Sequence, residues 1–225
     1  MAEDQAGQQE ITAFWNRVGP RYESSENVAV PGTDEYARWR AATQELLPAA
    51  SSDVLDVGTG TGFFARLAAE LGHRVTAIDV ADDMLAASTV RATDGDITFA
   101  VGDAVAPPFA AESFDAVVSR SLLWTLREPR RAFASWWRLL RPGGLVVAIY
   151  GLAPPGAPDE GPYTAATRAQ LPAMHLEDHD VPVRVAEAAG FGNISTTALQ
   201  ALRGWETSPG SDLPHALIGH RPPPA

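Results

Sequence analysis

Residues 54–62 are the feature that most constrains the fold of this chain. They read Val-Leu-Asp-Val-Gly-Thr-Gly-Thr-Gly, a short apolar strand followed by glycines at alternate positions. A helical segment comes next, and then Val75-Thr76-Ala77-Ile78-Asp79, a second apolar strand that ends in a carboxylate. Open α/β sheets use such a unit to bind a nucleoside-like cofactor, with the glycines at its charged end and the acid at its ribose.

The glycine spacing indicates which cofactor is bound. A dinucleotide-binding turn has its third glycine one position later, where helix and strand pack beside a pyrophosphate, but here Phe63 takes that position. Asp56 precedes Gly58 by two residues, and a carboxylate there suits a cationic ammonium group better than a diphosphate. S-adenosylmethionine has an ammonium group where NAD has a pyrophosphate. The alternative is a tight turn that needs glycine for backbone reasons alone.

The chain resembles the class I S-adenosylmethionine-dependent methyltransferases, specifically the small single-domain kind that acts on small molecules. Four blocks carry the resemblance, and it extends over nearly the whole chain, from Phe14 to His220. The blocks are residues 54–62, 75–85, 99–104 and the stretch from 114–120 to 139–147. The resemblance implies a Rossmann-like α/β three-layer sandwich, whose mostly parallel seven-stranded sheet ends in an antiparallel hairpin. It also implies S-adenosylmethionine as cofactor and S-adenosylhomocysteine as product.

Composition narrows the functional class. Apolar residues at 45% and charged residues at 20% are ordinary for a soluble globular protein of 225 residues. Cysteine is absent and all 17 basic residues are arginine, which excludes disulfides, thiolate metal ligands and lysine Schiff bases; no metal is expected. The net charge of −11, with arginines that do not cluster in the sequence, argues against nucleic acid and membranes as partners. The acidic, polar start favours a cytoplasmic location.

Alternating patterns predict the architecture. Strands are expected at 54–57, 74–79, 97–101, 114–119 and 145–150, with helices at 63–71, 82–91 and 130–140 between them, the last halted by Pro142-Gly143-Gly144. This order predicts a parallel sheet with helices on both faces, closed by an antiparallel pair at 194–199 and 214–220. Residues 1–225 are expected to form one domain. Within it, 1–48 would be a helical lid, and 151–180 a loop or cap insertion over the site. The first helix of the lid is expected around 11–18, where Ile11, Phe14, Trp15 and Val18 have helical spacing.

Several residues that could bind the cofactor fall at carboxyl ends of predicted strands, where open parallel sheets bind ligands. The resemblance implies that Gly58 and Gly60 let the backbone approach the methionine part and that Asp56 binds the ammonium group. It implies that Asp79 accepts both ribose hydroxyls and Asp103 the adenine amino group. The complete predicted set is Asp56, Gly58, Thr59, Gly60, Asp79, Val80, Met84, Asp103, Ala104 and Ser119.

Simpler interpretations of these residues stay open. Asp79 could only cap the next helix, Asp103 could be a turn residue, and Met84 could belong to the core. The resemblance implies that Met84 and the Val80 region pack on the two sides of the adenine and that the Ala104 amide contacts the adenine ring. It also implies that the Ser119 carbonyl helps to bind the amino end of the cofactor.

The acceptor site has weaker signals. The candidates for substrate binding are Phe14, Trp15, Tyr22, Trp124 and Tyr150, and those for catalysis are Tyr22, Arg120, Trp124, His175 and His179. His175 and His179 would share a helical face and could bind a metal or present a base if their stretch were helical. Pro172 and Pro182 flank the stretch, and a solvated turn is the favoured interpretation. Arg120 could anchor a substrate carboxylate or pair with an acidic neighbour.

Three functions are compatible with this reading. The leading hypothesis is methyl transfer to an oxygen, nitrogen or carbon atom of a small metabolite in specialised, natural-product metabolism, by a monomer or homodimer. The second is a protein of the same fold that binds S-adenosylmethionine without transferring its methyl group, for regulation or cyclisation. The third, an NAD-dependent oxidoreductase, is opposed by Phe63 and by the later blocks.

Overall fold

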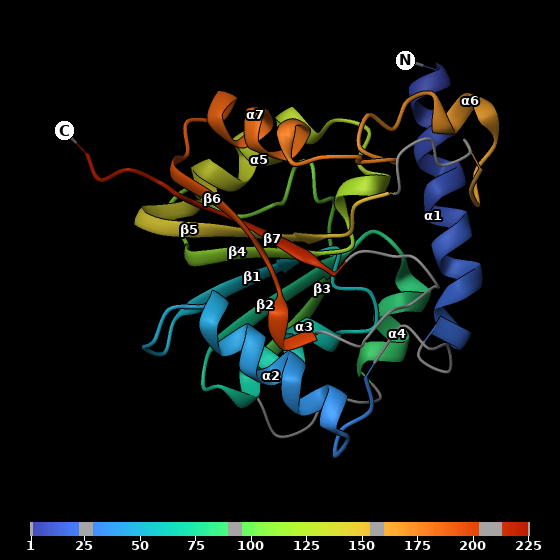
Figure 1. Cartoon of the computed structure of the whole chain (residues 1–225). Helices are drawn as coiled ribbons and strands as arrows, with labels where there is room; N and C mark the ends of the chain where they lie inside the picture. The colour runs from blue at the N-terminus through green and yellow to red at the C-terminus, as the bar shows by residue number, and fades with distance from the viewer. Residues whose placement is uncertain (1, 23–28, 90–95, 154–159, 203–212, 225) are drawn as a thin grey trace.

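The computed structural model covers the whole chain, and the structure describes residues 2–22, 29–89, 96–153, 160–202 and 213–224. The last two residues of the predicted helix at 82–91 and much of the loop at 151–161 lie outside these residues. A seven-stranded sheet forms the centre, in the order β3-β2-β1-β4-β5-β7-β6 (Figure 1). The strands are β1 (Asp53–Val57), β2 (Arg74–Asp79), β3 (Ile97–Val101), β4 (Phe114–Arg120), β5 (Leu140–Tyr150), β6 (Gly192–Ala198) and β7 (His215–His220).

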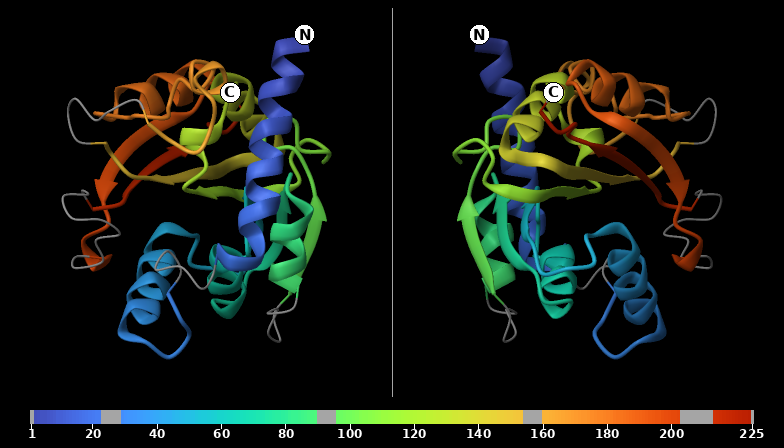
Figure 2. Two further views of the ribbon diagram at one scale, coloured as in Figure 1. Left: turned by 90° about the vertical axis from the view of Figure 1, so that its right-hand side faces the viewer. Right: turned by 90° about the vertical axis from the view of Figure 1, so that its left-hand side faces the viewer.

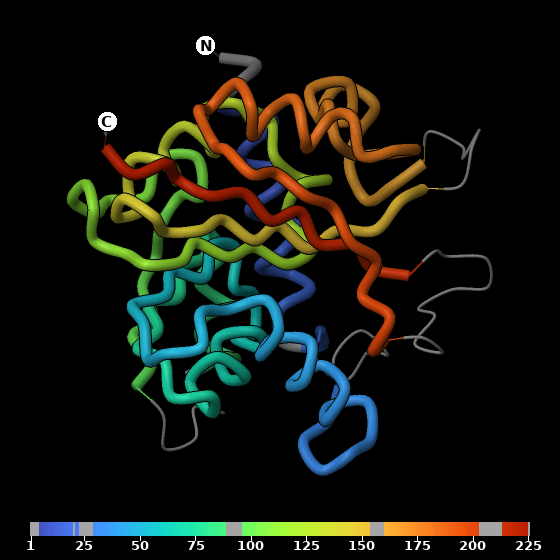
Figure 3. Tube along the Cα trace, turned by 60° about the vertical axis from the view of Figure 1, so that its left-hand side comes forward, coloured from blue at the N-terminus to red at the C-terminus, as the bar shows by residue number. Residues whose placement is uncertain are grey.

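The first five strands run parallel, and β7 runs antiparallel to both β5 and β6. The red strand β7 therefore lies between the yellow β5 and the orange β6 (Figure 3). The predicted fold class, including the antiparallel end of the sheet, is confirmed. Strand order reverses between β1 and β4, so the carboxyl ends of these strands are where this architecture binds ligands.

Helices cover both faces of the sheet because successive residues of its central strands are apolar on both sides. Leu55, Val117 and Val146 face α5 (Pro129–Leu139) and α7 (Asp180–Ala188) in one buried cluster. Their neighbours Val54, Val118 and Val147 face α2 (Asp34–Leu46) and α3 (Phe63–Glu70) in the other. The remaining helices are α1 (Ala2–Tyr22), α4 (Asp82–Thr89) and α6 (Ala165–Arg168), with short 3₁₀ turns η1 (Leu123–Thr125) and η2 (Gln200–Leu202).

Helix α1 crosses the carboxyl edge of the sheet (Figure 2). Near its N-terminus, Glu10 accepts hydrogen bonds from the Thr164 N–H (2.6 Å) and hydroxyl (2.8 Å) and from the Thr167 hydroxyl, at the start of α6. Near its C-terminus, Asn16 Oδ1 accepts from the Asp83 N–H at 3.1 Å. Gly19 lies so close to α4 that an added Cβ would be 3.0 Å from the Asp83 carbonyl carbon. These contacts fix α1 as a wall beside the strand ends.

Two local predictions differ from the structure, at the start of β5 and in the extent of the first helix, and the structure decides between the two interpretations of 171–179. Strand β5 begins at Leu140 and includes Pro142-Gly143-Gly144, because the Gly143 N–H donates to the Arg221 carbonyl and the Gly144 carbonyl accepts from Arg221. The predicted break between α5 and β5 was therefore wrong. Residues 171–179 form turns and bends, so His175 and His179 share no helical face, in agreement with the favoured interpretation as a turn. The first helix, expected around 11–18, spans Ala2–Tyr22.

In the described residues, no helix is long and apolar enough to cross a membrane.

Trp136 connects the fold to the loop after β3, and we predict that its substitution by Phe is costly. Its side chain is fully buried and its Nε1–H donates to the Ala104 carbonyl at 2.8 Å. Trp136→Phe should lower the free energy of unfolding by about 1–3 kcal/mol because the partly buried Ala104 carbonyl loses its donor. Urea denaturation measures the loss.

Trp137→Phe is the matched control. The neighbouring Trp137 makes an equivalent bond to the Gly190 carbonyl at 3.1 Å, but at the protein surface. The control should lose less stability than Trp136→Phe, since water can replace the missing donor. Equal losses for the two variants would contradict the buried role of the Ala104 bond.

Candidate active site

The glycine turn after β1 opens a pocket at the carboxyl edge of the sheet. Gly58 and Gly60 have φ values of +68° and +56°, which side chains rarely allow. An added Cβ at Gly58 would lie 2.6 Å from a methyl carbon of Leu122, whereas Gly60 has open space around it. The turn is tied to β2 because the Thr59 N–H donates to the Ile78 carbonyl at 3.0 Å. The pocket beside it measures about 960 Å³, including space open to solvent.

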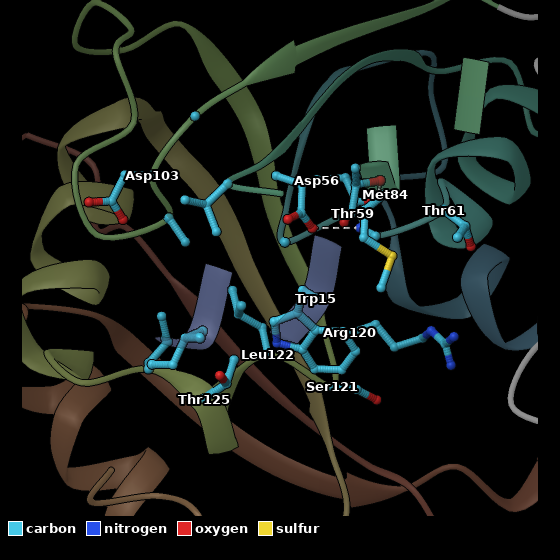
Figure 4. A pocket seen from close by; sticks show the side chains of 18 of the residues that line it. Trp15, Asp56, Thr59, Thr61, Met84, Asp103, Arg120, Ser121, Leu122 and Thr125 are labelled. Carbon is cyan, nitrogen blue, oxygen red and sulfur yellow. Dashed lines mark hydrogen bonds between the residues drawn. The ribbon is translucent and has the colours of Figure 1, made fainter. Parts of the chain in front are cut away.

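Asp56 lies at the end of β1 beneath this turn. Its side chain is 1% exposed, and its Oδ2 accepts a hydrogen bond from the Thr59 hydroxyl at 2.6 Å (Figure 4). Burial raises the pKa of Asp56 to about 6, while the Thr59 bond and the positive charge of Arg120 act in the opposite direction. A carboxylate with so little access to water is a strong attractor for a cation that enters the pocket.

Asp79 organises the second strand end. Its Oδ2 accepts from the Gly60 N–H at 2.8 Å and its Oδ1 from the Ala81 N–H at 2.9 Å. Burial raises its pKa, and these backbone bonds lower it. Asp79 lines the pocket. Because each carboxylate oxygen can accept more than one hydrogen bond, both oxygens retain capacity for two hydroxyl groups of a ligand.

Apolar and polar residues extend the pocket beyond Asp79. Val80, the buried Met84, Asp103 and Ala104 line it, as predicted residues of the adenine region. The exposed Asp103 Oδ1 also accepts the Val105 N–H at 2.8 Å, so this residue shapes its own turn. Figure 4 shows Asp103 and Arg120 at opposite ends of the pocket with Trp15 between them.

The strand end of β4 contributes Arg120. Its guanidinium lies over the rings of Trp39 (5.1 Å) and Phe63 (4.8 Å). Burial lowers its pKa, and the nearby carboxylates of Asp56 and Glu35 raise it. Arg120 lines the pocket but its preceding residue does not: Ser119 is 1% exposed, and its hydroxyl has no hydrogen-bond partner among the described residues. The predicted role of the Ser119 carbonyl stays a prediction.

Aromatic side chains form the wall opposite the glycine turn. Trp15 and Tyr22 of α1 line the pocket, and their ring centroids are 5.8 Å apart. Trp124 lies behind them, 5.8 Å from Trp15 and stacked on Tyr163 at 5.7 Å. Phe14 packs edge-on against Tyr163 at 5.4 Å. Two predicted substrate residues, Phe14 and Trp124, thus support the wall without lining the pocket.

The other acceptor candidates lie elsewhere. The Tyr150 hydroxyl and His179 Nδ1 are 2.8 Å apart at the start of α7, and neither residue lines the pocket. Burial raises the pKa of Tyr150 to about 12. His175 is exposed on the turn. The structure therefore brings Tyr22 and Arg120 to the pocket, and leaves Tyr150, His175 and His179 outside it.

Sequence reasoning missed part of the pocket lining. The missed residues, which share no one chemical character, are Gln8, Ile11, Thr61, Phe63, Phe64, Gly102, Val105, Ser121, Leu122, Thr125, Leu126 and Arg127. Ile11 was recognised only as one face of a helix. The segment 121–127 has no motif of its own, and only its position after the β4 strand end could have pointed to it.

Comparison with known proteins identifies the chain's relatives. The methyltransferase domain family matches residues 55–148. A demethylmenaquinone methyltransferase of Renibacterium salmoninarum is 35% identical over 166 residues, covering 73% of this chain and 68% of that protein. Two further demethylmenaquinone methyltransferases are matched over 60% and 59% of their length. The chain thus spans about three fifths to two thirds of the length of these relatives.

Solved structures share the fold. Phosphoethanolamine N-methyltransferase 2 of Haemonchus contortus, in complex with S-adenosylmethionine, gives a TM-score of 0.65 at 21% identity, over 83% of this chain and 52% of that one. The [4+2]-cyclase SpnF gives a TM-score of 0.71 at 19% identity, over 95% and 96% of the two chains. At such low identities, the likeness shows the fold alone.

A glycine turn between two buried acidic strand ends, on this sheet topology, defines the class of S-adenosylmethionine-binding α/β proteins. The chain belongs to the class I S-adenosylmethionine-dependent methyltransferases. The predicted family, enzyme class and cofactor are confirmed. The residues present fit this cofactor: Asp56 offers a buried carboxylate for an ammonium group, Gly60 an open backbone, and Asp79 two acceptor oxygens.

The ribose role of Asp79 gives the first test of the site. Asp79→Asn keeps the size of the side chain but replaces one acceptor oxygen by a donor and removes the charge. Two charge-assisted hydrogen bonds are worth about 3 kcal/mol or more together, so affinity for S-adenosylhomocysteine should fall at least about a hundredfold. Calorimetric titration measures it. Asp82→Asn, an exposed carboxylate three residues later, is the control and should bind normally.

Asp56 makes cofactor binding depend on pH. A bound ammonium group requires the ionised carboxylate, and the pKa of Asp56 in the folded protein without ligand is about 6. Affinity should therefore fall by up to about tenfold per pH unit below pH 6. Titrations between pH 5 and 7 test this, and the Asp56→Asn variant should bind weakly with no such dependence. A flat profile for the unaltered protein would contradict the ammonium role.

The Asp56 carboxyl group also makes the free energy of unfolding depend on pH. Its folded pKa lies above the unfolded value, so its contribution to stability is full below about pH 4 and is lost as the pH rises through 6. In the protein without ligand, Asp56→Asn should thus raise the free energy of unfolding more at pH 7 than at pH 4. Urea denaturation at the two pH values measures the difference.

Proposed function

We propose that this chain transfers the methyl group of S-adenosylmethionine to a small aromatic acceptor, with a quinol-like ring as the best-fitting class. The observation that carries the proposal is the aromatic wall of α1, where Trp15 and Tyr22 face the glycine turn across one continuous pocket. A flat ring between this wall and Leu122 would lie beside the methionine end of the site. The relatives act, by their name, on demethylmenaquinone, which is a quinone.

In this proposal, one set of pocket residues binds the cofactor and another orients the acceptor. Asp56, the glycine turn and Asp79 would hold the cofactor, which when bound supplies a methyl group already activated on a sulfonium. Trp15 and Leu122 would orient the acceptor ring and exclude water, and alignment of two reactants in this way can lower a barrier by roughly 7–11 kcal/mol. Desolvation also strengthens the interactions of charges inside the pocket.

Tyr22 is the proposed contact to an acceptor hydroxyl. It lines the pocket, and the cationic Arg120 is close enough to interact with its hydroxyl. That positive charge favours a phenolate on an acceptor bound in this region. A phenolic acceptor would thus be activated at its oxygen or, through the ring, at carbon.

The wider predictions for the chain stay predictions. They are a role in specialised metabolism, a monomeric or homodimeric state, a cytoplasmic location, one domain over 1–225, and an acceptor among small molecules alone.

Product analysis tests the proposed activity. Purified protein with S-adenosylmethionine is offered a naphthoquinol, a phenol, an amine and an indole, and NMR locates the new methyl group. We expect transfer to the naphthoquinol. Tight binding of S-adenosylmethionine with transfer to none of the four would favour the alternative, a cofactor-binding protein without methyl transfer.

Tyr22→Phe tests the catalytic contact. Since positioned acid–base groups contribute roughly a hundredfold or more, kcat should fall by at least about tenfold while cofactor affinity is unchanged. Tyr36→Phe is the matched control, because its hydroxyl donates to Glu70 at 2.7 Å, away from the pocket lining. An unchanged kcat in Tyr22→Phe would remove Tyr22 from the mechanism.

A further inference from the structure

A second hollow lies between the start of α5 and α7, which pack side by side over the same face of the sheet (Figure 1). Its walls carry four arginines and one glutamate, together with short apolar side chains. We name it the arginine groove, and its lining residues are Arg127, Glu128, Pro129, Arg130, Arg131, Pro172, Val181, Arg184 and Val185.

The charge of the arginine groove is opposite to that of the chain as a whole. The chain carries a net charge of −11, yet four of its 17 basic residues line this one hollow against a single glutamate. Three of them are close in the sequence, and the fold adds Arg184 from α7. A local concentration of positive charge attracts anions even on an acidic protein, because clefts focus the field.

The ion pairs in the arginine groove are exposed, so an anionic ligand can compete with their carboxylates. Arg131 is 3.3 Å from Glu128, and Arg184 is 3.2 Å from Asp180. All four side chains are well exposed, between 49% and 68%. Exposed pairs of this type contribute little to stability, so a ligand anion can replace the carboxylates. Within the described residues, Arg130 has no ion-pair partner at all.

The groove adjoins the active-site pocket. Arg127 lines both hollows, and its neighbours Thr125 and Leu126 belong to the wall of the pocket. A substituent that extends out of the active-site pocket past Arg127 would therefore enter the arginine groove.

From this geometry we propose that the methyl acceptor carries an anionic group, a carboxylate or a phosphate, which binds in the arginine groove while the ring lies in the pocket. The inference rests on the proposed function, because it assigns a substrate class to the same site. Guanidinium groups suit both anions, since their paired N–H donors match two oxygens at once.

Matched acceptors test the proposal. Each neutral aromatic acceptor is compared with one derivative that bears a carboxylate and one that bears a phosphate monoester on a side chain. For the unaltered protein we expect kcat/KM to be at least about tenfold higher for one anionic derivative, which corresponds to one good charge-assisted contact. The preferred derivative then distinguishes carboxylate from phosphate. Equal kcat/KM for neutral and anionic members would overturn the inference and leave the proposed methyl transfer intact.

The double variant Arg130→Gln/Arg184→Gln removes two charges from the groove. It should abolish the preference for the anionic acceptor while changing kcat/KM for the neutral one by less than about twofold, because exposed charges away from the reacting atoms affect binding alone. The control is Arg38→Gln/Arg40→Gln, which removes the same charge from exposed positions on α2. Equal effects of the two double variants would attribute the preference to net charge and overturn the site.

A binding measurement keeps the test independent of turnover. Inorganic pyrophosphate and citrate are titrated into the protein saturated with S-adenosylhomocysteine. One of the two should bind, with affinity reduced at least about tenfold in Arg130→Gln/Arg184→Gln and unchanged in the α2 control. If neither anion binds, the proposal that the arginine groove binds anions is wrong, whatever the activity assays show. Failure of the proposed function would instead appear as absent methyl transfer to every acceptor, neutral or anionic.

Discussion

The carboxylate of Asp79 joins three segments that are separate in the chain. It ends β2, accepts the Gly60 N–H from the turn after β1, and accepts the Ala81 N–H ahead of α4. Burial of a carboxylate is costly, and these backbone donors offset part of that cost. The glycine turn needs the acid for its own geometry, so the shape of the pocket and the presence of a ligand-binding acid depend on the same side chain.

A pocket at the edge of a sheet is open on one side unless another element covers it. Helix α1 does so here through a few specific contacts at its two ends. Glu10 is bound by Thr164 and Thr167, Asn16 accepts from α4, and Gly19 permits close approach. Between Glu10 and Asn16 the helix presents Ile11 and Trp15 to the pocket, and its last residue, Tyr22, also lines it. The covering helix is thus both a barrier to water and the source of the aromatic wall, which links acceptor recognition to its docking.

The sequence predicted the sheet well because buried parallel strands give local signals. Val54–Val57 and the strand ending at Asp79 are short apolar runs between turns, and the acids at their ends lie in the pocket as the strand positions require. The start of β5 was missed because its pairing depends on Arg221, some eighty positions away in the chain. Spacing alone could not exclude a helix at 175–179, since the contact of His179 with Tyr150 is a tertiary one.

The acceptor side was harder to predict for the same reason. Its wall combines α1 with the segment after β4, and its support comes from Tyr163 beyond the sheet, so no single stretch carries the pattern. The arginine groove shows the same limit for charge: composition describes the chain as acidic, but the field at a site depends on which charges the fold gathers. Because Arg127 belongs to both hollows, the proposed anionic group and the proposed acceptor ring would be recognised at once. Such two-point recognition would orient the ring before the reaction, which is the main task that an activated methyl donor leaves to the protein.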